Sequence, residues 1–122
     1  MGTRSLTFTY DREEGVIMCL YRQFDGYPEG HGKDLAEIIT TTENNGMECL
    51  SASIVAKLKT GAYNVYLYPT DVDDCGQEYE YHIYKDRVEV YSCPFHYDRQ
   101  PRFTGTYQEF LEFCTNQNRK VA

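Results

Sequence analysis

The stretch EYEYHIYKDRVEVY (Glu78–Tyr91) alternates apolar and polar residues on both sides of Lys85 and Asp86. A two-residue turn at these positions brings the flanking segments into a consistent cross-strand register. Apolar pairs then share one face and polar pairs the other: Ile83 with Val88, Tyr81 with Val90, His82 with Glu89, and Tyr84 with Arg87. The stretch therefore predicts an antiparallel hairpin, which is the firmest anchor for a β-sheet in the chain.

Two further strands are predicted near the start of the sequence. Leu6, Phe8 and Tyr10 alternate with polar residues, as is typical of a strand with one buried face. VIMCLYRQ (16–23) follows the polar turn DREEG (11–15) and has the composition of a more fully buried strand. These two strands are expected to form a second antiparallel hairpin.

The middle of the chain predicts two helices and a strand. Apolar residues at helical spacing begin at Leu35, and the helix should end before ENNG (43–46), whose glycine can take positive φ. Ser51 is expected to cap a short second helix that Gly61 ends. YNVYLYP (63–69) alternates as a third strand.

The last part of the chain is expected to hold a loop and a helix. SCPFHYDRQPRFTG (92–105) contains two prolines, which disfavour a helix or a central strand, so it predicts a long irregular connection. Thr106 and Glu109 make a capping box that opens a final helix. The order ββααβββα predicts an α+β fold in one globular domain, 1–122, with a single antiparallel-rich sheet and the helices packed on one face.

Composition restricts the partners and the compartment. The net charge of −7 disfavours a duplex nucleic acid, although a small anion held by a few arginines is compatible with it. The five cysteines contain no CxxC pair, which favours reduced thiols in a cytoplasmic protein. No signal peptide is visible, and the longest apolar run, 16–21, is too short to span a bilayer, so no membrane partner is expected. Nothing in the sequence calls for a cofactor or a metal.

The segment YRQFDGYPEGHGKD (21–34) is the main candidate for a binding site. It links a strand to a helix, where glycines allow a backbone to approach a ligand and amides attract anions. It does not match the phosphate-binding loop of nucleotide hydrolases, because the glycine spacing and the residue after Lys33 are wrong. An elaborate turn and helix cap is the alternative, with Asp34 at the helix start.

Arginines and histidines extend this candidate. Arg4 and Arg22 lie on neighbouring predicted strands, and two arginines in one cleft would suit a phosphate or carboxylate. Arg99 and Arg102 are interleaved with aromatic residues in the predicted loop, a pattern that suits base stacking, a protein interface or a loop held by its own rings. His31, between two glycines, is expected to be exposed.

The segments MGTRSLTF (1–8) and YRQFDGYPEGHG (21–32) resemble those of a group of small uncharacterised proteins from bacteriophages, giant viruses and some bacteria. That group is similar in a GTRS-type beginning and a Tyr-Arg-x-x-Asp-Gly-Tyr-Pro-x-Gly-x-Gly loop, and it has no assigned function. The resemblance implies that its matching residues form one feature: Gly2, Thr3, Arg4, Ser5, Arg22, Asp25, Gly26, Tyr27, Gly30 and Gly32.

These observations lead to a functional hypothesis with two alternatives. The hypothesis is a small cytoplasmic protein, in the host cytoplasm if virus-encoded, that binds an anionic small molecule such as a signalling nucleotide and sequesters it without catalysis. The expected ligand-binding residues are Arg4, Arg22, Asp25, Gly26, Tyr27, Gly30, His31, Gly32, Arg99 and Arg102. The alternatives are a protein–protein interaction module acting on a host protein or on a second copy of the chain, and a small hydrolase using Asp25 with His31 or His96.

Overall fold

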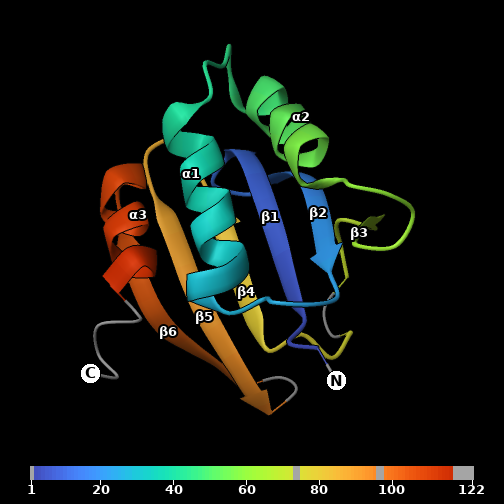
Figure 1. Ribbon diagram of the computed structural model, residues 1–122. Coiled ribbons are helices and arrows are strands. Elements are labelled where there is room, and N and C mark those ends of the chain that lie inside the picture. The colour runs from blue at the N-terminus through green and yellow to red at the C-terminus, as the bar shows by residue number, and fades with distance from the viewer. Residues whose placement is uncertain (1, 73–74, 96–97, 117–122) are drawn as a thin grey trace.

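The computed structural model describes residues 2–72, 75–95 and 98–116, which contain one mixed sheet and three α-helices (Figure 1). The strands lie in the order β3-β2-β1-β4-β5-β6, and every neighbouring pair is antiparallel except β1 and β4, which are parallel. The strands are β1 (Ser5–Arg12), β2 (Gly15–Arg22), β3 (Val65–Tyr68), β4 (Tyr79–Ile83), β5 (Val88–Phe95) and β6 (Asp98–Gly105). The helices are α1 (Lys33–Thr41), α2 (Met47–Leu58) and α3 (Tyr107–Asn116).

The hairpin predicted over 78–91 is confirmed in its register. His82 pairs with Glu89 and Ile83 with Val88 between β4 and β5. The Tyr84 amide donates to the Arg87 carbonyl at 2.9 Å, which closes the expected two-residue turn at Lys85 and Asp86. The β1–β2 hairpin also forms as predicted.

The segment after this hairpin is a correction to the sequence analysis. Residues 92–105 do not form an irregular connection, because β5 continues to Phe95 and β6 pairs with it from Asp98. Proline is tolerated here because β6 is the last strand of the sheet and Pro101 needs no ladder hydrogen bond on its outer side. The β5–β6 register also shifts between Ser92 and Phe95, around Pro94. The expected order ββααβββα is thus one strand short.

The second helix also begins earlier than expected. It starts at Met47, after Gly46 with φ of 108°, so Ser51 lies inside α2 rather than at its N-cap. The Ser51 hydroxyl donates to the Met47 carbonyl at 2.7 Å, and its oxygen is 2.7 Å from Thr9 Oγ1, whose hydroxyl can donate to it. Gly61 does have positive φ, but the helix already ends at Leu58.

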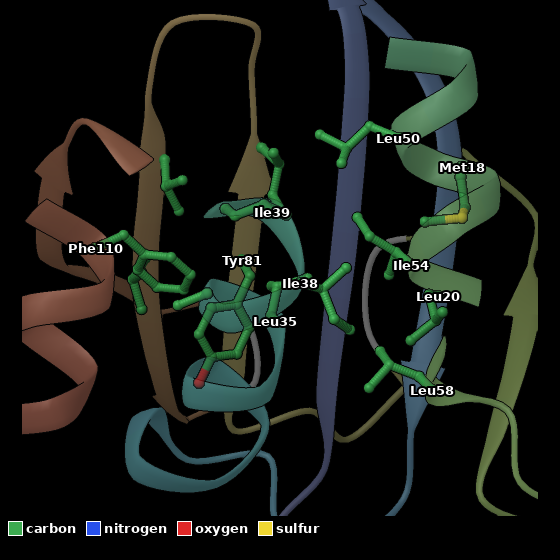
Figure 2. Close-up of a cluster of buried hydrophobic side chains, with 14 of the residues drawn as sticks. Met18, Leu20, Leu35, Ile38, Ile39, Leu50, Ile54, Leu58, Tyr81 and Phe110 are labelled. Carbon is green, nitrogen blue, oxygen red and sulfur yellow. The ribbon is translucent and has the colours of Figure 1, made fainter. Parts of the chain in front are cut away.

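The three helices lie over the same face of the sheet (Figure 1). Figure 2 shows how their apolar side chains meet those of the strands. The resulting core includes Leu35 from α1, Ile54 from α2, Phe110 from α3, and Leu20 and Tyr81 from the sheet. A second apolar cluster, on the opposite face, is made of Leu6, Phe8, Tyr10, Cys19 and Tyr21.

The face opposite the helices is rich in tyrosine. Tyr21 stacks on Tyr68 and Tyr10 stacks on Tyr84, with ring centroids 4.8 Å and 4.3 Å apart. Both strands of the β1–β2 hairpin are therefore buried on two sides, which explains why Ser5, Thr7 and Thr9 are also inaccessible to solvent. Among the described residues, no helix has the length and apolar character needed to cross a membrane.

The predicted capping box of α3 is present and gives a first test of this fold. The Thr106 amide donates to Glu109 Oε1 at 2.8 Å, and the Glu109 amide donates to Thr106 Oγ1 at 3.1 Å. We expect Thr106→Ala to lower the free energy of unfolding by about 1 kcal/mol, since it leaves a helix-end amide without its acceptor. Gln108→Ala, on an exposed position of the same helix, is the control and should change stability by less than about 0.5 kcal/mol in urea denaturation.

Candidate functional site

The segment between β2 and α1 is folded tightly onto the sheet. It contains a single turn of π-helix, η1 (Pro28–Gly32), which runs directly into α1. Its entrance is a sharp bend at Asp25, a non-glycine residue with φ of 61°. Two backbone hydrogen bonds hold this bend: the His31 amide donates to the Asp25 carbonyl at 2.6 Å, and the Gly26 amide donates to the Thr3 carbonyl at 2.8 Å.

The glycines of this segment are explained by close packing. A methyl group on Gly26 would lie 2.8 Å from the Thr3 carbonyl oxygen, and one on Gly30 would lie 2.6 Å from the Asp25 carbonyl oxygen. On Gly32 it would lie 2.9 Å from Cys114 Sγ of α3. Glycine is required at these positions because neighbouring chain segments approach too closely for a side chain.

His31 is fully buried, which corrects the expectation that it is exposed. Its Nδ1 is 3.2 Å from Arg22 Nη1, and its Nε2 is 2.7 Å from Thr7 Oγ1. An arginine can only donate, so Nδ1 is the acceptor and the ring proton lies on Nε2, which donates to Thr7. Burial and the Arg22 charge lower the pKa of His31 to about 3, so the ring is neutral at physiological pH.

Arg22 connects this buried histidine to the surface. Its Nη1 also donates to Asp34 Oδ2 at 3.0 Å, and its Nη2 is 4.0 Å from Asp25 Oδ2. The Arg22 side chain is 17% exposed, whereas the two carboxylates are at least half exposed. The guanidinium is thus fixed from the inside by His31 and accessible from the outside.

A groove of about 430 Å³ lies beside Arg22, between α1 and the end of α2. We call it the Arg22 groove. Its charged side chains are Arg22, Asp34, Glu37 and Lys57, so both signs are present. Its remaining walls are Ile38, Thr41, Leu58, Thr60 and Asn64. Asn64 is held in place by donating from its Nδ2 to the Leu58 carbonyl at 2.5 Å.

The other predicted site residues are divided between the two sides of the sheet. Tyr27 stays with the loop, since its hydroxyl donates to Asp25 Oδ1 at 3.1 Å. Arg102 donates to Ser92 Oγ at 2.7 Å. Arg4 packs on Gly76 and influences the pKa of Tyr21, and Arg99 donates to Glu80, so both lie on the face away from the helices. Arg4 and Arg22 therefore do not share a cleft.

A second polar cluster was missed from the sequence. The carboxylate of Glu80, 1% exposed, accepts from Arg99 Nε, Gln77 Nε2 and His82 Nε2 at 2.8, 2.8 and 3.0 Å. The other ring nitrogen of His82 is 2.5 Å from the Tyr10 hydroxyl. His82 is thus bonded to Glu80 on its own strand rather than to Glu89. Tyr10 comes close only because β1 pairs in parallel with β4, which no local pattern indicates.

Two parts of the sequence-based hypotheses lie outside the described residues. These are His96, offered as one partner of Asp25, and Tyr97 of the aromatic loop. Among the residues that are described, no group of three or more His, Cys, Asp or Glu side chains could hold a metal ion.

The buried histidine makes stability depend on pH in a specific direction. The unfolded state binds a proton at His31 near pH 6.5, but the folded state does so only near pH 3, so stability is complete above 6.5 and falls as the pH drops toward 3. His31→Gln keeps an acceptor for Arg22 and a donor for Thr7 but cannot titrate. We expect the variant to be less stable than the native chain at pH 7.5. Between pH 6.5 and 5, the native chain should lose stability more steeply than the variant, by up to about 1.4 kcal/mol per pH unit.

Urea denaturation of both chains across this pH range measures the difference, because other titrating groups are common to the two. Parallel stability curves for the native chain and the variant would contradict a buried neutral His31.

Comparison with known proteins adds no relative to this description. No family model matches the chain, and neither a curated protein nor a solved structure matches it. The contacts, burial and charge of the described residues are therefore the basis for a functional proposal.

Proposed function

We propose that this protein binds a small molecule through an anionic group, such as the phosphate of a nucleotide, in the Arg22 groove. The observation that carries the proposal is the way Arg22 is held at the groove wall. The fully buried, neutral His31 accepts a hydrogen bond from Arg22 Nη1, and the bond between His31 and Thr7 holds the histidine in place. An arginine oriented in this way loses little side-chain entropy on binding, which favours affinity.

The present partners of Arg22 do not oppose an anion strongly. His31 contributes no negative charge, and Asp34 and Asp25 have side chains that are 50% and 58% exposed. An exposed ion pair contributes only about 0–1 kcal/mol. A phosphate can therefore replace Asp34 at Nη1 at small cost, while Lys57 adds a second positive charge from α2.

The acidic side chains of the groove narrow the class of ligand. Asp34 and Glu37 would repel a simple polyanion, but carboxylates are good acceptors for hydroxyl and amino groups. A molecule with a phosphate at one end and hydroxyl donors at the other fits this mixed lining. A nucleotide has both, and a volume of about 430 Å³ falls in the range of small-molecule sites.

A role in sequestration is compatible with this site. Both nitrogens of His31 are engaged within the fold. The hydrolase hypothesis that pairs Asp25 with His31 therefore has little support. If the chain is virus-encoded, holding a host signalling nucleotide without turning it over is the proposed role.

The test is a thermal-shift screen of nucleotides, cyclic nucleotides and sugar phosphates, followed by titration of any hit. A ligand at about 100 times its dissociation constant adds roughly 2.7 kcal/mol to stability. We expect Lys57→Ala to weaken a hit about tenfold, because the residue is exposed and adds charge without supporting the fold. We expect Asp34→Asn to strengthen it, since Arg22 then loses a competing carboxylate.

Lys85→Ala is the matched control, because it removes the same charge from an exposed turn remote from the groove. If all three variants, Lys57→Ala, Asp34→Asn and Lys85→Ala, bind the hit with equal affinity, the hit binds outside the Arg22 groove. A screen with no hit would contradict the proposed binding of an anionic small molecule.

The edge strand β3 favours a second candidate, the protein-interaction module. It is the last strand on its side of the sheet, it carries no charged residue, and Leu67 and the nearby Tyr63 are 62% and 79% exposed. Uncharged, apolar edge strands readily pair with another chain. An apolar hollow of about 370 Å³ between β3 and α2 could receive a partner's side chain. We propose a second copy as the occupant, through antiparallel pairing of two β3 strands about a twofold axis.

Sedimentation equilibrium over a range of concentrations tests this pairing. We expect a monomer–dimer equilibrium that Leu67→Lys abolishes, because like charges would then meet across the new strand pair. Gln108→Lys adds the same charge on α3 and should leave the equilibrium unchanged. A native chain that stays monomeric at millimolar concentration excludes the dimer.

A further inference from the structure

The face of the sheet away from the helices carries a hollow of about 400 Å³ that the proposed function does not use. We call it the open-face hollow. Aromatic rings make most of its walls, and ionic side chains complete it: Phe8, Tyr10, Glu80, His82, Tyr84, Glu89, Tyr91 and Arg99. All of them except Tyr84, which directly follows β4, come from β1, β4, β5 and β6, so the sheet itself holds them in register. This volume is suited to a small molecule.

The hydrogen bonds beneath the hollow hold Glu80 and His82 in place. Despite burial, the bonds from His82 and Gln77 and the Arg99 charge hold the pKa of Glu80 below its usual range, so its carboxylate only accepts. His82 Nε2 therefore donates to Glu80. Its Nδ1 is 2.5 Å from the Tyr10 hydroxyl, which also hydrogen-bonds with Tyr84, so Tyr10 is engaged within the fold.

A hydroxyl and a carboxylate at the hollow have spare acceptor capacity. Tyr91 donates to Glu89 Oε1 at 3.0 Å, and Arg87 Nε donates to Glu89 Oε2 at 2.8 Å. Each carboxylate oxygen can accept more than one hydrogen bond, so Oε1 retains acceptor capacity. The Glu89 side chain is 19% exposed. Tyr91 and Glu89 thus offer acceptor atoms to the hollow.

The rings that surround these acceptors favour a planar cation. Tyr10 and Tyr84 stack with centroids 4.3 Å apart, and Phe8 stacks on His82 at 4.9 Å. The protein's own Arg87 shows what such walls accept, because its guanidinium carbon lies 3.9 Å from the centroid of the Tyr84 ring while its Nε binds Glu89. Cation–π attraction and carboxylate bonds act together on that group.

We infer that the open-face hollow is a second ligand site, which takes a small molecule bearing a planar amidinium or guanidinium group. The ligand's N–H groups donate to Glu89 and to the Tyr91 oxygen, and its plane lies against the aromatic walls. The site is separate from the Arg22 groove, since the two lie on opposite faces of the sheet. The inference does not depend on the function proposed for that groove.

Benzamidine is the probe, and benzoate is its matched opposite, with the same ring and the reverse charge. Isothermal titration should detect benzamidine and give no signal with benzoate. In two-dimensional amide NMR, benzamidine should shift the resonances of Glu80, His82, Glu89 and Tyr91 and leave those of α1 in place. This mapping uses the native chain and so needs no variant to fold.

Glu89→Gln should weaken benzamidine about tenfold, because a neutral amide replaces a charge-assisted acceptor of the same size. Glu13→Gln is the control, since Glu13 also pairs with Arg87, at 2.8 Å, but is 71% exposed and does not line the hollow. The site would be overturned by equal affinity for benzamidine and benzoate, or by resonance shifts confined to other parts of the chain. Equal effects of Glu89→Gln and Glu13→Gln on benzamidine affinity would also overturn it.

Discussion

The hydrogen-bonded chain from Thr7 through His31 to Arg22 is the constraint on which the rest of the structure depends. A buried imidazole is tolerated only when both nitrogens have partners, and here one partner is on β1 and the other at the end of β2. The histidine therefore ties the connecting segment to the central hairpin. Because η1 runs directly into α1, the same tie sets where that helix lies on the sheet.

Hydrogen bonds to distant segments also explain two polar residues of β1 inside the protein. Thr7 and Thr9 face the helices, where apolar side chains would be the usual choice, and both are completely inaccessible to solvent. Thr7 bonds His31, and Thr9 bonds Ser51 of α2. One strand thus uses its hydroxyl face to position the connecting segment and a helix, while its aromatic face, with Phe8 and Tyr10, builds the opposite side of the sheet.

Local patterns predicted the elements that local interactions determine. The register of the 78–91 hairpin and the capping box at Thr106 follow from neighbours in sequence, and both are correct. The misses came from contacts between distant segments. β6 is a strand despite Pro101 because it lies at the edge of the sheet. His31 is buried although glycines flank it, and the same glycines allow the close packing that buries it. Tyr10 meets His82 only through the parallel β1–β4 pairing.

The positions of the charges separate the two candidate sites more clearly than the net charge does. The acidic total of −7 suggests little affinity for anions anywhere on the surface. Yet Arg22 binds the neutral His31 on its inner side and Asp34 on its outer side, whereas Arg87 is surrounded by Glu13, Asp86 and Glu89. A ligand responds to the field at its own site, because salt screens distant charges within about 10 Å. We therefore propose an anion for the helix side of the sheet and a cation for the opposite face, each from the charges at its own site.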